Sequence, residues 1–234
     1  ILYGKIKLDK KKILKKIINF FLFNKNIKYF FYEKNNVRIY TDSHENVSVI
    51  QNKKLIKELS YQQIYGKLVN SRYNEVLKSG TPKFLKKIYG STLLLAQGAS
   101  GYSNYSHWLL DILPRIKLFT LACNKPIDNI YLNTPNKFQR DTLKILGLKN
   151  INFVNSKKQR HIFVNKLFFC SHPNYHKGTI MEAHSKIPGW IIKYIRKKFL
   201  FKSHKKYKKK LKVFIDRSDS SYSCLLYTSP TPRD

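Results

Sequence analysis

Gly98–Phe119, GASGYSNYSHWLLDILPRIKLF, is the stretch on which the interpretation of this chain depends. Its small residues predict a loop. Ser103 or Asn104 can then cap a helix, because a side-chain oxygen accepts a bond from a free backbone N–H. At about 100° per residue, one arc of that helix gathers apolar side chains, namely Leu109, Ile112, Leu113, Ile116 and Phe119. Pro114 lacks the N–H that would bond the carbonyl four residues earlier, which predicts a kink.

The opposite face of the same helix carries polar side chains at helical spacing. His107, Asp111 and Arg115 follow one another four residues apart, and Asn104 falls in the same sector. The simplest interpretation is a solvated stripe with an Asp111–Arg115 pair worth a few tenths of a kcal/mol. The alternative is a site, because the stripe aligns an imidazole, a carboxylate and a guanidinium.

A family resemblance favours the site. Asn104–Arg115, NYSHWLLDILPR, resembles the signature of glycosyltransferase family 61, which combines Asn, His-Trp, an acid and Leu-Pro-Arg. That family includes bacterial capsule and lipopolysaccharide enzymes and eukaryotic xylosyl- and N-acetylglucosaminyltransferases. Lys212–Asp219, KVFIDRSD, resembles the family strand that leads toward the nucleotide-sugar site. The resemblance implies inverting transfer of a sugar from a nucleotide-sugar to a glycan hydroxyl, in surface polysaccharide biosynthesis.

The resemblance also implies roles for the helix residues. His107 would take the acceptor proton with Asp111 orienting it, or would donate to the phosphates as a neutral imidazole. Asn104 and Arg115 are candidate substrate-binding residues, although Arg115 could instead clamp Asp111 or the helix bend. The implied whole fold is of GT-B type, with two Rossmann-like lobes facing a cleft, and this chain is expected to be the N-terminal part, inactive by itself.

Arg217 and Ser218 are the candidate contacts for the diphosphate. They directly follow a predicted strand that ends at Ile215, and ligands of parallel sheets bind beyond the carboxyl ends of the strands. Arg217 could also simply pair with Asp216 or Asp219. Because such folds hold a diphosphate with side chains and helix N-termini, we expect no obligatory metal and no cofactor besides the donor substrate.

Histidines elsewhere give no metal motif. Cys170, His172, His176 and His184 are close in sequence, but their spacing matches no zinc-binding pattern. We interpret them as scattered surface histidines.

Composition bounds the class of protein. The chain has 234 residues, of which 42% are hydrophobic, enough for one large or two small domains with a core. Its net charge of +33 comes from 38 lysines and only 8 arginines. Proteins that recognise nucleic acids rely on arginine for bidentate contacts, so we attribute most of the charge to codon bias. A basic module that binds nucleic acid or an anionic membrane is the alternative function.

The cysteines and the apolar segments bear on location. Cys123, Cys170 and Cys224 form no C-x-x-C pair, which indicates a reducing compartment. Ile13–Phe23 is eleven residues long and contains two lysines, too short to cross a bilayer. We expect it to be a helix, either buried or lying on a membrane. The prediction is a cytoplasmic protein, in peripheral contact with the inner face of the membrane.

The pattern along the chain predicts an α/β fold. Lys5–Lys34 is expected to form a helix and then a strand near Ile27–Phe31, and Val47–Leu59 a β-hairpin. Strands and helices then alternate, which favours a Rossmann-like parallel sheet flanked by helices. The expected strands are Lys87–Ala96 (as paired strand material), Asn129–Leu132, Ile151–Val154, Ile162–Cys170 and Leu211–Ile215, and the further helices are Phe138–Leu146 and Pro188–Phe201.

Three segments are expected. Residues 1–46 form a basic N-terminal segment, and residues 47–223 contain the N-terminal lobe and the start of the second. Residues 224–234, CLLYTSPTPRD, resemble a translated sequencing adapter and are left out of the fold.

Overall fold

The computed structural model describes residues 7–8, 15–22, 25–42, 46–65, 67–96, 105–123, 125–173 and 187–200, with side chains from Tyr29 onward. All of them belong to one packed unit, Ile1–Leu200. The predicted strand Leu211–Ile215, together with Asn104, Arg217, Ser218 and residues 224–234, lies outside the described residues.

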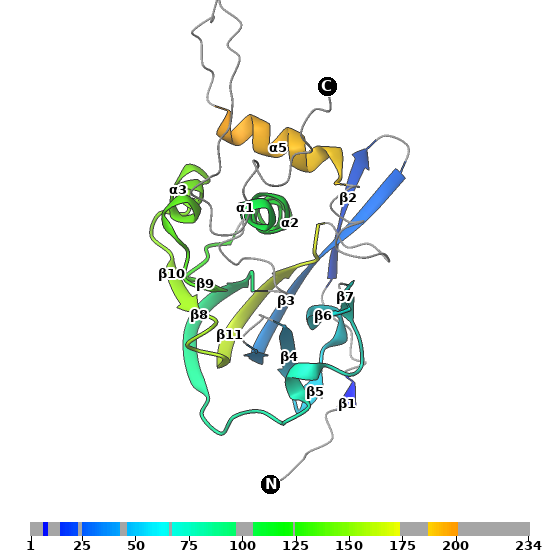
Figure 1. The fold of residues 1–234 in the computed structure, drawn as a ribbon, viewed down its shortest axis with the longest axis vertical. Coiled ribbons are helices and arrows are strands. Elements are labelled where there is room, and N and C mark those ends of the chain that lie inside the picture. The colour runs from blue at the N-terminus through cyan, green and yellow to red at the C-terminus, as the bar shows by residue number, and fades with distance from the viewer. Residues whose placement is uncertain are drawn as a thin grey trace, which may run out of the picture. The chain divides into compact units, whose positions relative to one another are not determined.

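Nine strands of this described part form one mixed sheet (Figure 1), in the order β1-β5-β4-β3-β11-β8-β9-β10 with β2 beside β3. Their bounds are β1 Lys7–Leu8, β2 Lys15–Leu22, β3 Lys25–Thr41, β4 Val47–Gln51, β5 Lys54–Leu55, β8 Lys86–Leu94, β9 Asn129–Leu132, β10 Asn152–Asn155 and β11 His161–Cys170. The strands β6 (Tyr61–Ile64) and β7 (Lys67–Asn70) form a separate hairpin.

The prediction of a parallel sheet is correct for one half only. β11, β8, β9 and β10 are parallel neighbours. β3 runs antiparallel to β11, β2 and β4. Short connections such as those from β2 to β3 and from β3 to β4 join antiparallel strands, because a parallel neighbour needs a long crossover. The fold is therefore α/β with a mixed sheet flanked by helices, and its parallel half is compatible with a Rossmann-like arrangement.

The expectation for the N-terminal region is half correct: the strand predicted near Ile27–Phe31 lies within β3, but the predicted helix is absent. The predicted helix within Lys5–Lys34 is instead the strand β2, which pairs with the first half of β3. Its Ile and Phe residues have high strand propensity, and it pairs with β3 over its whole length. The strand β3, which belongs to the predicted N-terminal segment 1–46, lies between β4 and β11 in the sheet.

The remaining predicted elements are largely confirmed. The Val47–Leu59 hairpin is present as β4 and β5, and its turn residues Asn52 and Lys53 have the left-handed φ values, 49° and 59°, of a two-residue turn. The helices are α1 (Tyr105–His107), α2 (Leu113–Ala122), α3 (Lys137–Ile145) and α5 (Gly189–Phe199), with the short 3₁₀ turns η1 (Lys57–Leu59) and η2 (Glu75–Leu77). Gly147 ends α3 with φ +88°, as predicted.

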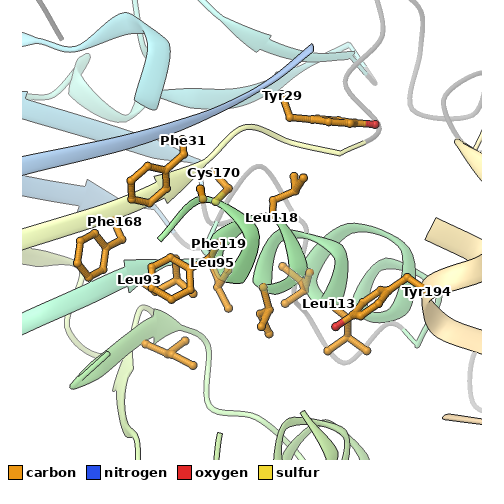
Figure 2. Packing of buried hydrophobic residues seen from close by; sticks show 14 of the residues in the cluster. Tyr29, Phe31, Leu93, Leu95, Leu113, Leu118, Phe119, Phe168, Cys170 and Tyr194 are labelled. Atoms are coloured by element: carbon orange, nitrogen blue, oxygen red, sulfur yellow. The ribbon is translucent and has the colours of Figure 1, made fainter. Parts of the chain in front are cut away.

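Helices α2, α3 and α5 cover one face of the sheet. Figure 2 shows α2 between side chains from the strands, such as Phe31 and Phe168, and Tyr194 of α5. The rings of Phe119 on α2 and Phe168 on β11 lie 5.3 Å apart between centroids. This packing fixes α2 above the carboxyl half of β8 and β11, which is where the site described next begins.

The other face of the sheet is covered by η1 and β6. Tyr61 of β6 stacks on Phe169 of β11, with 6.0 Å between ring centroids and 19° between planes. β11 is apolar along most of its length, and its side chains pack on both faces of the sheet. No helix among the described residues has the length and apolar character needed to span a bilayer.

Candidate functional site

After β8, the next described element is α1. It continues through a π-helical turn, Trp108–Ile112 (labelled η3), into α2. The N–H of Leu113 donates to the carbonyl of Trp108, five residues back. Pro114 follows directly, as the second residue of α2. The kink predicted at Pro114 is not tested, but the residues just before it form a π turn, a feature often found at functional sites.

The π turn is anchored by its tryptophan. Trp108 is completely buried, and its Nε1 donates to Thr142 Oγ1 of α3 at 2.8 Å. A buried indole with its N–H satisfied holds its backbone in one place. The backbone on either side of Trp108 therefore has a fixed position.

His107 and Asp111 form a hydrogen-bonded pair across this turn. His107 Nδ1 lies 2.6 Å from Asp111 Oδ2, and the two side chains are 21% and 3% exposed. An ionised carboxylate can only accept, so in the neutral imidazole that bonds to it Nδ1 donates and Nε2 carries the lone pair. The pair is an oriented, partly exposed imidazole whose second nitrogen can accept a proton.

A second histidine faces the same carboxylate. His172 Nε2 lies 3.8 Å from Asp111 Oδ1, and its side chain is 7% exposed. His172 comes two residues after the end of β11, the parallel neighbour of β8. The expectation that it is a surface histidine is wrong. The signal that points to it is its place just beyond a long apolar strand, at the sheet edge that β8 also reaches.

Arg115 does not lie with the pair on an open polar face. Its side chain is completely buried, and the guanidinium donates to the carbonyls of Leu95 (2.8 Å) and Leu94 (2.6 Å). The described contacts of Arg115 secure the carboxyl end of β8, and its role in substrate binding stays a prediction. The π turn explains the burial of Arg115, since it winds more loosely than an α-helix and shifts later residues off the stripe.

The stripe as a whole is also not solvated. Asp111 is 2% exposed and Arg115 is fully buried, so this helix packs on both faces. Asn104, Arg217 and Ser218 lie outside the described residues, so the structure brings together His107, Asp111 and His172 alone of the residues considered. Within the part of the chain that is described, no group of three or more His, Cys, Asp and Glu side chains could hold a metal ion.

A second carboxylate, Asp128, lies near the amino end of β9. Its Oδ2 accepts from the backbone N–H of Ser91 at 2.7 Å and from the Ser91 hydroxyl at 2.8 Å. These bonds hold the pKa of Asp128 below its ordinary value. Gly90 has φ +82°, and a Cβ there would lie 2.5 Å from the same oxygen. The glycine is needed for this close approach.

A third histidine, His161, starts β11 and has a structural environment. Its Nδ1 lies 2.9 Å from the carbonyl of Pro82 and 3.2 Å from that of Phe84. Burial lowers the pKa of His161, which favours the neutral imidazole. His161 thus ties the chain before β8 to the start of β11.

Comparison of the chain with protein families, characterised proteins and solved structures gives no match. The function is therefore argued from the site residues and from the resemblance of the Asn104–Arg115 segment.

Proposed function

We propose that this chain is the N-terminal lobe of a two-lobed, inverting glycosyltransferase, with His107 as the general base. The single observation that supports this most is the 2.6 Å contact between His107 Nδ1 and Asp111 Oδ2. It orients an imidazole at the carboxyl edge of parallel strands, the edge where ligands of α/β sheets bind. The resemblance to glycosyltransferase family 61 supplies the reaction.

The chemistry follows from the orientation of the imidazole. The acceptor hydroxyl oxygen forms a bond to the anomeric carbon while the bond from that carbon to the diphosphate breaks on the opposite side. The hydroxyl proton passes to Nε2 of His107, and the buried carboxylate of Asp111 stabilises the resulting imidazolium. A positioned general base contributes typically about 10²–10⁴-fold to the rate.

Other parts of the proposal rest on the resemblance. The donor is a nucleotide-sugar, the acceptor is a glycan, and Arg217 and Ser218 contact the diphosphate without an obligatory metal. Asn104, three residues before His107, contacts substrate. The enzyme acts in the cytoplasm, peripheral to the membrane on which surface polysaccharides are made.

The test is sugar transfer by the complete two-lobed gene product carrying His107→Asn. Asparagine keeps an N–H that can face Asp111 but has no nitrogen that accepts a proton. We expect kcat to fall by about 10²–10⁴-fold with little change in the KM for the donor.

The control is His161→Asn, which changes a histidine of the same sheet far from the proposed chemistry and should leave kcat near its original value. Wild-type turnover by the His107→Asn enzyme would refute the role of His107. Absence of transfer from any nucleotide-sugar, together with strongly salt-dependent binding to DNA or anionic vesicles, would support the alternative function.

A further inference from the structure

Both oxygens of the Asp111 carboxylate face an imidazole. Oδ2 is 2.6 Å from His107 Nδ1, and Oδ1 is 3.8 Å from His172 Nε2. The carboxylate and His172 are almost completely enclosed, with side chains 3% and 7% exposed. A charge removed from water to this degree depends on its protein partners for stabilisation. The His172 side is therefore part of what defines the carboxylate position.

The backbone on both sides of His172 is tied to β3. The N–H of Ser171 donates to the carbonyl of Phe30 at 2.9 Å, and the N–H of Phe30 donates to the Ser171 hydroxyl at 3.0 Å. On the other side, the Tyr29 hydroxyl donates to the carbonyl of Pro173 at 3.2 Å. Three hydrogen bonds thus hold the residues that flank His172.

Tyr29 links this anchor to α5. Its hydroxyl accepts a hydrogen bond from Trp190 Nε1 at 2.9 Å, and the two rings meet edge to face with 5.6 Å between centroids. Burial raises the pKa of Tyr29 to about 12, so the hydroxyl keeps its proton and can donate to Pro173. The segment that carries His172 is fixed from a strand and from a helix.

We propose that His172 is a positioning residue for the His107–Asp111 pair. From the end of β11, its Nε2 lies 3.8 Å from Oδ1 of Asp111 and limits the positions that the carboxylate can take, which keeps Oδ2 beside Nδ1 of His107. His172 contacts no reacting atom in this account and acts through Asp111. The proposal rests on the proposed function for its catalytic meaning, but the geometry it describes can be measured without substrate.

The experiment uses the full 234-residue chain with ¹⁵N-labelled histidine, and reads the two ring nitrogens of His107 by long-range ¹H–¹⁵N NMR. The His107→Asn chain assigns the signals. His172→Phe keeps a ring but removes the N–H. We expect the ratio of the Nδ1–H to the Nε2–H form of His107 to fall about threefold, the effect of losing one weak polar contact to the carboxylate.

Two further variants separate positioning from general damage. His172→Gln places an amide donor where Nε2 stood and should restore most of the original ratio. His161→Gln changes the buried histidine at the other end of β11 and should leave the His107 signals unchanged. A ratio in His172→Phe that equals the wild-type ratio, or that moves no more than in His161→Gln, would overturn the proposal.

Tyr29→Phe keeps the proposal testable if His172→Phe fails to fold. It removes the hydroxyl that ties Pro173 and leaves His172 in the chain. The ratio should shift in the same direction by a smaller factor, and no shift would count against positioning through this anchor. Because no substrate is present, a failure here is distinct from a failure to transfer sugar.

Discussion

Two carboxylates, which lie near opposite ends of the parallel strands, have different hydrogen-bond partners. Asp128, near the amino end of β9, accepts from the backbone and hydroxyl of Ser91, groups that do not titrate in the physiological range. Asp111, at the carboxyl edge, faces the imidazoles of His107 and His172. The first arrangement fastens a loop to a strand. The second orients an imidazole, which the proposed function uses as a base.

The two carboxylates differ in burial, since Asp111 is buried and Asp128 is exposed, and also in the groups that they bond. A carboxylate bonded to fixed N–H and O–H donors stays ionised and fixed. A carboxylate bonded to an imidazole favours one of the two positions of the ring proton. The variants below test this contrast between the two edges.

The largest expected effect on stability comes from Arg115→Leu. It removes the guanidinium that bonds the carbonyls of Leu94 and Leu95 at the end of β8. Leaving these buried acceptors without that partner should lower the free energy of unfolding by about 2–5 kcal/mol. Chemical denaturation measures it.

Arg140→Leu is the matched control. Arg140 is exposed and donates to one backbone carbonyl, that of Pro135, at 2.9 Å. Its loss should cost under about 1 kcal/mol. If both variants lose the same stability, Arg115 is not the fastening of the carboxyl edge that we describe.

A smaller effect is expected from Asp128→Asn, and it should depend on pH. The folded-state pKa of Asp128 is lowered by its bonds to Ser91. The stabilisation is therefore present above the unfolded-state pKa and is lost as the pH falls through the lower folded-state pKa. Because Asp128 is exposed, we expect a difference from wild type of at most about 1 kcal/mol at pH 7, approaching zero in acid.

Urea unfolding of both proteins at several pH values between 7 and 3 measures this difference. If the difference in unfolding free energy between the two proteins stays constant over this pH range, the charge of Asp128 does not stabilise its contact with β8.

Much of the fold could be predicted from local signals. The strand Asn129–Leu132, the helix that Gly147 ends and the hairpin at Asn52 are set by short patterns that need no distant partner. The strand β2 could not be predicted in this way. Its short apolar run with two lysines fits a helix as well as a strand, and only the pairing with β3 decides for the strand.

The part of the site whose residues are close in sequence could be predicted. His107 and Asp111 are one helical turn apart, and helical spacing alone brings them into reach. The burial of Arg115 depends on a π turn that no spacing rule indicates. His172 reaches Asp111 only because β11 lies next to β8. A contact made by strands far apart in sequence requires the tertiary structure.

The most direct test of the account is the protonation of one imidazole. In the unmodified chain, long-range ¹H–¹⁵N NMR at a pH where His107 is neutral should show the proton on Nδ1 and the lone pair on Nε2. A His107 ring that carries its proton mainly on Nε2 would contradict the bond to Asp111, and with it the role of His107 as a base.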